Sequence, residues 1–176
     1  MRRMALPTAI LYRKAMNERD PMQYRPCVGA MVVNANGEAF VGKRIDNREG
    51  DWWQMPQGGV DAGEEFEAAM RREIAEETGI PGGLLEIVAQ LPDELFYDLP
   101  PELHGKLWGG RYRGQRQSWF LVRFTGTDAD IDLEAHDPPE FCEWKWVEPE
   151  LLPDLIVPFK RRVYETIVEG FRERLG

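Results

Sequence analysis

The sequence predicts one α/β domain in which helices cover a mostly antiparallel or mixed sheet. Three observations predict this class: a hairpin of two apolar segments near the N-terminus, an amphipathic helix after it, and a second amphipathic helix that closes the chain. With 176 residues, 43% of them hydrophobic, the chain is long enough to bury one sizeable core. Strands and helices in this order favour a sheet layered between helices.

The first half of the chain contains the hairpin and the first helix. Residues 26–44, PCVGAMVVNANGEAFVGKR, place two β-rich segments around Asn36 and Gly37, a common hairpin turn. A short apolar piece, WWQMPQ, leads into the loop GGVDAG at residues 58–63. Residues 64–78, EEFEAAMRREIAEET, are predicted to form a helix that ends before Gly79, which is a suitable residue just beyond a helix C-terminus.

The second half is predicted to supply three strands and the closing helix. The strands are LLEIVAQL at residues 84–91, QSWFLVRF at 117–124 and FCEWKWV at 141–147. Residues 159–175, FKRRVYETIVEGFRERL, have the periodicity of an amphipathic helix. Most of the six tryptophans lie in or near apolar strands, so their number alone predicts no stacking platform.

Charge and composition limit the classes of partner. A formal net charge of -9 disfavours general coating of nucleic acid, although it allows a small basic pocket for one end of a nucleic acid. Cys27 and Cys142 are too few for a disulfide framework or a zinc cluster, which favours reduced thiols and a cytoplasmic location. We expect no membrane partner, since no run of roughly 18 apolar residues occurs, and no obligate protein partner.

The N-terminal stretch carries no recognisable export signal. Its basic start is followed by a short apolar segment and then by more charge, without a convincing cleavage pattern. Met22 could begin a shorter chain. We therefore expect residues 1–23 to be an arm, disordered or created by the choice of start codon, and residues 24–176 to be a single domain.

The predicted helix at residues 64–78 changes character along its length. At about 100° per residue, Glu73, Glu76 and Glu77 continue the stripe that Phe66 and Met70 begin. Paired glutamates on a helix are usually solvated. On an inward stripe, however, three carboxylates repel one another unless something neutralises them, and a divalent cation would do so. The glycine-rich loop before the helix could add carbonyl ligands.

The stretch GGVDAGEEFEAAMRREIAEETGI resembles the signature motif of the Nudix hydrolases. Every fixed place of that motif is filled, by Gly58, Glu64, Arg72, Glu73, Ile74, Glu76, Glu77, Gly79 and Ile80. The segments YRPCVGAMVVN, WWQMPQGG, GQRQSWFLVRF, PPEFCEWKWV and VPFKRRVY are similar to the branch with RNA pyrophosphohydrolases and asymmetric dinucleoside tetraphosphate hydrolases. The resemblance implies an α/β/α sandwich with a mixed central sheet.

The resemblance also implies a metal-dependent reaction at a phosphoric anhydride bond. It gives Mg²⁺ or Mn²⁺ as the cofactor, with ligands from Gly58, Glu73, Glu76, Glu77 and Glu140. Glu73, Glu76, Glu77 and Arg72 are then the candidate catalytic residues. One glutamate must activate water, and we favour Glu73. Arg72 is expected to orient a carboxylate, because an arginine fork fixes carboxylate geometry.

A second set of residues is expected to bind the substrate. Arg25 and Arg44 resemble phosphate-contacting positions, and the segment VPFK resembles the region that receives a base. The candidates are Arg25, Arg44, Tyr97, Gln117, Val157, Phe159 and Lys160. A packing role for Phe159 and a solvated Lys160 are the plain alternatives.

The expected activity is removal of pyrophosphate from the 5′-triphosphate end of RNA, which leaves a 5′-monophosphate. Asymmetric cleavage of diadenosine tetraphosphate and related dinucleotides is the close alternative, because both substrates place a polyphosphate on the same metals. A non-catalytic module that senses a nucleotide, and a purely structural protein, are alternatives of other classes. The complete glutamate set argues against both.

Overall fold

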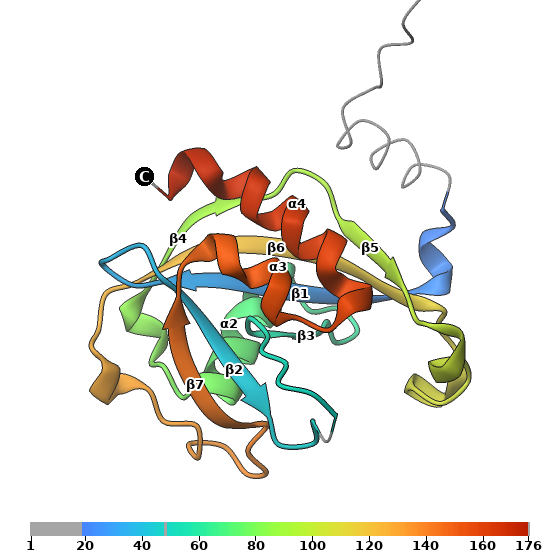
Figure 1. Cartoon of the computed structure of the whole chain (residues 1–176), viewed down its shortest axis with the longest axis horizontal. Coiled ribbons are helices and arrows are strands. Elements are labelled where there is room, and N and C mark those ends of the chain that lie inside the picture. The colour runs from blue at the N-terminus through green and yellow to red at the C-terminus, as the bar shows by residue number, and fades with distance from the viewer. Residues whose placement is uncertain (1–18, 48, 176) are drawn as a thin grey trace, which may run out of the picture.

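A mixed seven-stranded sheet forms the centre of this computed structural model, which describes residues 19–47 and 49–175 (Figure 1). The main strand order is β4-β6-β1-β2-β7, with β3 paired to β1 and β5 paired to β6. The strands are β1 Tyr24–Val33, β2 Ala39–Arg44, β3 Gln57–Gly59, β4 Leu85–Gln90, β5 Leu95–Asp98, β6 Gly114–Phe124 and β7 Phe141–Val147. Strands β1 and β6 run parallel over their whole register, and the other strand pairs are antiparallel.

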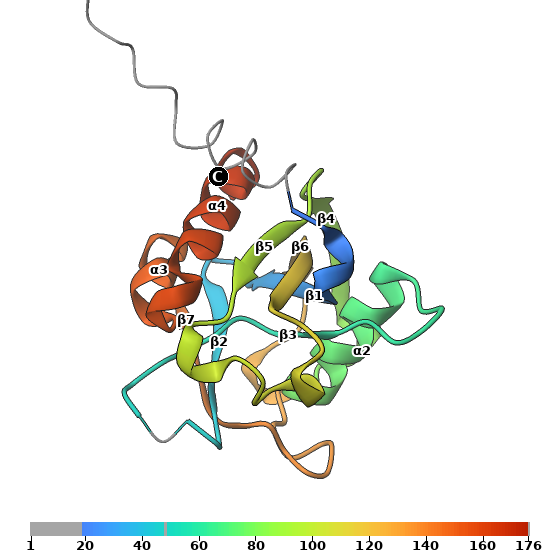
Figure 2. The same cartoon turned by 90° about the vertical axis from the view of Figure 1, so that its right-hand side faces the viewer.

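Helices cover both faces of this sheet (Figures 1 and 2). Helix α2, Phe66–Thr78, lies on one face, and α3, Leu152–Leu155, and α4, Arg161–Phe171, lie on the other. Each face has its own apolar core, because side chains alternate along a strand. Met31 and Trp119 belong to the core under α4, whereas Val32 and Phe120 belong to the core under α2. The predicted α/β/α sandwich is confirmed.

Most of the predicted elements are present. Strand β7 has the predicted bounds, and α2 ends at Thr78, followed by Gly79 with a left-handed φ of 69°. The closing helix is shorter than predicted, since Arg161–Phe171 is α-helical and 3-10 turns flank it. Strand β5 and the short helix α3 were not predicted, because four-residue elements give little periodic signal.

The hairpin of β1 and β2 opens towards the end that carries the candidate site. The two strands pair at Val33 and Ala39, beside the turn that contains Gly37. Farther from the turn, the segment 54–59 lies between them. Gln54 bridges to Gly42 of β2, and β3 pairs with Cys27–Gly29 of β1. This inserted segment leads directly into the glycine-rich loop and α2.

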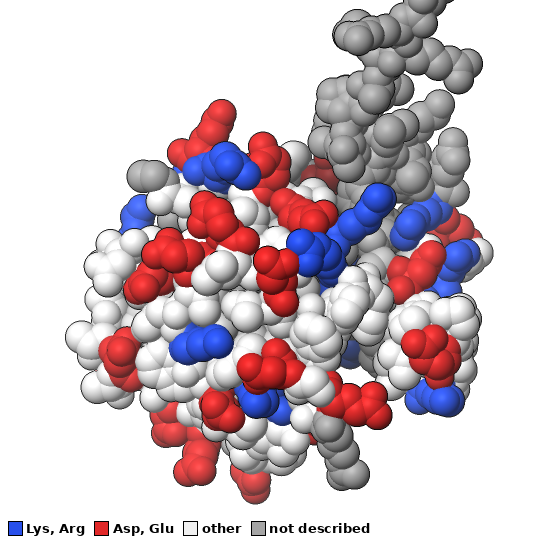
Figure 3. All heavy atoms as spheres, viewed as in Figure 1, with Lys and Arg blue, Asp and Glu red and all other residues white. Residues whose placement is uncertain are grey.

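The arm expected at residues 1–23 falls mostly outside the described residues, which begin at Arg19. Asp20 caps a 3-10 turn at Pro21–Gln23, and β1 then starts at Tyr24. None of the helices in the described ranges has the length and apolar character needed to cross a bilayer. Acidic and basic side chains are interspersed on the face shown in Figure 3, which displays no continuous basic field.

Candidate active site

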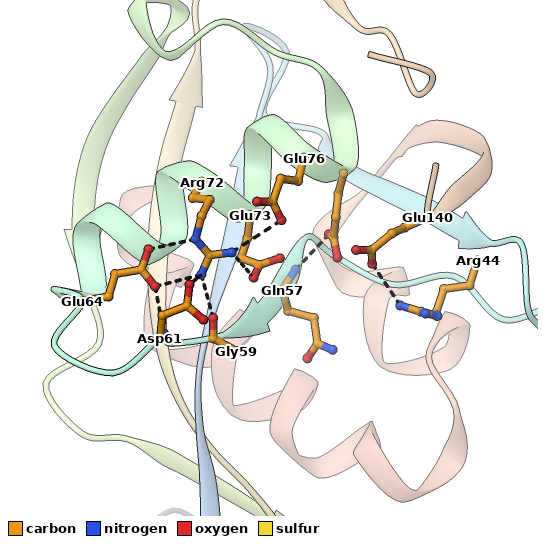
Figure 4. Close-up of polar contacts among 10 residues, drawn as sticks. Arg44, Gln57, Gly59, Asp61, Glu64, Arg72, Glu73, Glu76 and Glu140 are labelled. Atoms are coloured by element: carbon orange, nitrogen blue, oxygen red, sulfur yellow. Dashed lines mark hydrogen bonds and ion pairs between the residues drawn. The ribbon is translucent and has the colours of Figure 1, made fainter. Parts of the chain in front are cut away.

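Arg72 is the centre of a polar cluster on α2 (Figure 4). Its Nε and Nη2 donate to the two carboxylate oxygens of Glu64, each at 2.8 Å. Its Nη2 also donates to the Gly59 carbonyl at 2.9 Å, and its Nη1 donates to Glu73 at 2.7 Å and to Glu76 at 3.4 Å. Hydrogen bonds from Arg72 hold the pKa of Glu64 down at about 2. The guanidinium therefore ties the loop before α2 to the glutamates on the helix.

Glu73 lies against the backbone at Gly58. A Cβ atom at Gly58 would lie 2.0 Å from the Glu73 carboxyl carbon, so this approach requires glycine. Burial raises the pKa of Glu73, while its hydrogen bond from Arg72 acts in the opposite direction. Nearby Glu76 and Glu140 raise this pKa further. The Glu73 carboxylate is thus both desolvated and crowded by like charge.

Glu77 is the most deeply buried carboxylate of the cluster, with 1% of its surface exposed. Its Oε2 accepts from the Gln57 backbone N–H at 3.1 Å, and its Oε1 has no hydrogen-bond partner among the described residues. Burial raises the pKa of Glu77 well above its ordinary value, and the charges of Glu140 and Glu73 add to this rise. An orphaned, buried carboxylate oxygen is the kind of ligand that a hard cation satisfies.

The predicted inward stripe of three glutamates is correct for two of them. Glu73 and Glu77 are buried, whereas the side chain of Glu76 is 37% exposed and pairs with Arg72 at the edge of the helix. The offset follows from helical geometry, because Glu76 lies on the far side of Glu73 from Glu77.

Glu140 reaches the cluster from the segment before β7. Its Oε2 lies 3.4 Å from Nη1 of Arg44, whose Nε and Nη2 bind the two oxygens of Asp46 at 2.8 and 3.0 Å. Figure 4 shows Arg44 and Glu140 facing one another beside the helix glutamates. Arg44 thus places cationic charge next to the carboxylates, although Asp46 takes two of its donors.

The donor set suits a divalent cation, but the side chains are not arranged around one. Four carboxylates gather from α2 and from the segment before β7, and oxygen ligands are those that Mg²⁺ and Mn²⁺ prefer. Within residues 19–47 and 49–175, no three acidic, histidine or cysteine side chains converge closely enough to hold a metal ion. Arg72 occupies oxygens of Glu73 and Glu76, so the guanidinium stands where a cation would compete.

A cavity of about 410 Å³ lies beside these carboxylates. It is lined by residues from most of the elements around the open end of the sheet: Arg25, Arg44, Asp46, Gln54, Gln57, Gly58, Gly59, Glu73, Tyr97, Leu99, Leu107, Trp108, Gln115, Glu140, Phe159 and Lys160. Cationic and aromatic groups thus line the same cavity as Glu73 and Glu140. A nucleotide polyphosphate carries both features that such a cavity could bind, anionic phosphates and flat bases.

Lys160 and Phe159 lie over Tyr97 at one wall of this cavity. Lys160 Nζ is 5.2 Å from the centre of the Tyr97 ring, and the Phe159 ring centre is 5.7 Å from it. Burial lowers the pKa of Lys160 to about 8, and the charge of Arg44 contributes to the decrease. Phe159 keeps 37% of its surface exposed and lines the cavity, so its ring is not confined to the core.

The structure does not bring all predicted substrate-binding residues to the cavity. Gln117 is buried beneath it, where its amide nitrogen donates to Gln57 and Gln115 at 2.7 and 2.8 Å. Its amide oxygen accepts from Trp119 at 3.0 Å. Val157 packs against the core under α4 and is absent from the cavity lining.

Sequence reasoning missed several residues of the cavity, including Gln54, Gln115 and Trp108. Alternation on β6 was the available signal for Gln115, since residues two apart share a face. Gln54 is 7% exposed, and its amide nitrogen is buried without a partner among the described residues. Trp108 lies in a stretch without periodicity, so no pattern placed it.

Comparison with solved structures identifies the fold. A dihydroneopterin triphosphate pyrophosphohydrolase from E. coli superposes with a TM-score of 0.64 at 19% identity, covering 83% of this chain and 97% of that one. A C. elegans Ap4A hydrolase in a binary complex gives a TM-score of 0.62 at 20% identity, covering 85% of this chain and 98% of that one. At these identities the likeness concerns the fold alone.

Sequence comparison identifies closer relatives. A protein of Novosphingobium aromaticivorans named RNA pyrophosphohydrolase is 62% identical over 86% of this chain and 94% of its own length. One from Erythrobacter litoralis with the same name is 57% identical over 88% of this chain and 94% of its own length. The model of the NUDIX domain matches residues 23–167. The chain therefore belongs to the NUDIX family.

Proposed function

We propose that this protein removes pyrophosphate from the 5′-triphosphate end of RNA and leaves a 5′-monophosphate. The observation that carries the proposal is the cavity that Arg25, Arg44 and Lys160 line together with Glu73 and Glu140. Three cations match a chain of phosphates, and the adjoining carboxylates can bind the ions that phosphoryl chemistry needs. The relatives named RNA pyrophosphohydrolase support RNA as the substrate.

Nudix proteins generally need divalent metal ions. Here Glu73, Glu76, Glu77 and Glu140 would hold Mg²⁺ or Mn²⁺, with the Gly58 carbonyl as a further ligand. The bound ions would neutralise phosphate charge and make water a better nucleophile. Because Arg72 binds Glu73 and Glu76, cation binding would compete with this guanidinium for carboxylate oxygens.

The protein's own residues divide the remaining work. Arg25, Arg44 and Lys160 would bind the phosphates, while Tyr97 and Phe159 would border the nucleotide. Glu73 is the helix glutamate that lines the cavity, and its raised pKa suits a group that accepts a proton from water. Arg72 would keep this carboxylate oriented through its contact at 2.7 Å.

A comparison of substrates tests the proposal. Purified protein with Mg²⁺ is given triphosphorylated RNA or diadenosine tetraphosphate at matched concentrations, and pyrophosphate and nucleotide products are quantified. We expect the higher kcat/KM on RNA, with pyrophosphate released. A higher kcat/KM on diadenosine tetraphosphate would assign the asymmetric dinucleotide reaction instead. Nucleotide binding without cleavage of either compound would identify a sensing module.

A further inference from the structure

Arg25 differs from the other arginines of the site, because its guanidinium has no hydrogen-bond partner among the described residues. Arg72 donates to three carboxylates and a carbonyl, and Arg44 donates to Asp46 and Glu140. The guanidinium of Arg25 lines the cavity, yet it forms no hydrogen bond or ion pair with any described residue. Its fork therefore offers its full set of donors to a ligand.

The Trp108 ring and the backbone at Gly59 lie against this guanidinium. Arg25 Cζ lies 5.5 Å from the centre of the Trp108 ring, within the range of a cation–π contact. On the β3 side, a Cβ atom at Gly59 would lie 2.3 Å from Nη2 of Arg25. The missing side chain of Gly59 thus makes room for the guanidinium beside the backbone.

Trp108 has an unusual backbone conformation. Its φ is 52°, in the left-handed region that residues other than glycine rarely adopt, and Gly109 and Gly110 follow with φ of 67° and 71°. In this conformation the Trp108 side chain packs against the core under α4 and contacts Arg25. A side chain kept in a disfavoured backbone conformation beside a cavity is a common feature of functional sites.

We propose that Trp108 is a positioning residue that orients Arg25 for phosphate. An acidic partner would fix the arginine too, but it would neutralise the cation and occupy the donors that phosphate needs. The face of an indole orients a guanidinium and leaves its in-plane N–H groups free. This inference deepens the proposed function and rests on it for the identity of the ligand as a polyphosphate.

Direct stacking of a base on Trp108 is the competing role, and inorganic tripolyphosphate separates the two because it has no base. Calorimetry measures the binding of tripolyphosphate to the full-length protein. Metal is left out so that no turnover interferes. We expect W108A to weaken tripolyphosphate binding about three- to thirtyfold, the range of a cation–π contact. W108F should restore most of the affinity.

A double-mutant cycle isolates the Arg25–Trp108 contact. In the R25A background, W108A should cause little further loss of tripolyphosphate affinity, because the group that it positions is gone. W52A is the matched control, since Trp52 is a partly exposed tryptophan outside the cavity lining, and it should bind like the wild type. Thermal unfolding of each variant identifies any loss of folding, and W108F and R25A keep the test informative if W108A unfolds.

Several outcomes would overturn the inference. One is unchanged tripolyphosphate binding in W108A with weakened ATP binding, which indicates stacking. Equal losses from W108A in the presence and absence of Arg25, or undetectable tripolyphosphate binding by the wild type, would also do so. Failure of the proposed function is distinguishable, because it shows as uncleaved triphosphorylated RNA while the coupling of Arg25 and Trp108 persists.

Discussion

The Arg72 guanidinium meets the Glu64 carboxylate through two parallel contacts, Nε to Oε1 and Nη2 to Oε2, each 2.8 Å long. This arrangement leaves Nη1 directed at Glu73, 2.7 Å away. A lysine has no planar fork and cannot reproduce both contacts at once. The orientation of Glu73 therefore depends on arginine at position 72.

We expect R72K to lower kcat on triphosphorylated RNA about 10- to 100-fold, the usual effect of removing a residue that orients a metal-binding or catalytic group. R71K is the matched control, because Arg71 pairs with Glu67 on the outer side of the same helix at 3.1 Å. Steady-state kinetics of both variants checks this prediction. Similar losses in the two variants, both of which keep the positive charge, would show that the effect does not come from the orientation of Glu73.

We expect E77Q to reduce turnover strongly and to make the metal-free protein more stable above mildly acidic pH. Glu77 is buried beside other carboxylates, and a glutamine keeps its shape and the oxygen that accepts from Gln57 while removing the charge. The gain in free energy of unfolding should be about 1 to 3 kcal/mol once Glu77 would be ionised. Urea unfolding in EDTA measures it.

The pH dependence of that gain has a definite sign. The folded state raises the pKa of Glu77, so it binds this proton more tightly than the unfolded chain does. The corresponding stability is present below the ordinary value of 4.5 and is lost as pH rises towards the folded-state pKa. E77Q should flatten this decline. A decline of the same steepness in E77Q would assign it to other groups.

Periodicity explains which parts of the molecule could be predicted from sequence. Helix α2 and strand β7 are long enough to show their periods, and Gly79 marks a helix end by its left-handed φ. The cavity joins segments with no such signal. Trp108 belongs to an irregular stretch, and Gln54 reaches the site because β1 and β2 diverge. Gln117 was expected to bind substrate, but it is buried on β6 beside Gln115, which lines the cavity instead. The two residues share a face of the strand, so alternation alone does not distinguish them.

Lys160 should make phosphate binding sensitive to mildly alkaline pH. Burial lowers its pKa to about 8, so the ammonium is charged below this pH and neutral above it. The KM for triphosphorylated RNA should therefore rise as pH increases through 8. K160M should have a higher KM that lacks this step. K145M is the control, because Lys145 lies over Trp53 and is absent from the cavity lining.

Lys160 should also affect stability, with a pH dependence opposite in sign to that of Glu77. The folded state lowers the pKa of Lys160 from 10.5 to about 8, so the unfolded chain binds this proton more tightly between those values. The contribution of Lys160 to the free energy of unfolding should thus increase as pH rises from 8 to 10.5. Comparing urea unfolding of wild type and K160M across this range measures the difference, and parallel curves would contradict the prediction.

Methionine substitutions at two buried glutamines should have different effects on the free energy of unfolding. The Gln117 amide makes three hydrogen bonds, to Gln57, Gln115 and Trp119. Q117M removes them and leaves buried partners unpaired, so it should lower the free energy of unfolding by about 2 to 4 kcal/mol. The Gln54 amide nitrogen is buried without a partner among the described residues, while the bridge of Gln54 to Gly42 uses its backbone.

Q54M should therefore leave stability unchanged or raise it by about 1 kcal/mol, since an unsatisfied buried donor is replaced by an apolar chain of similar size. Urea unfolding of both variants in EDTA gives the comparison, and identical denaturant dependence would show that the unfolded states are alike. The sign of the difference is decisive. If Q54M destabilises the protein as much as Q117M does, the Gln54 amide has a partner that satisfies it in solution, such as an ordered water.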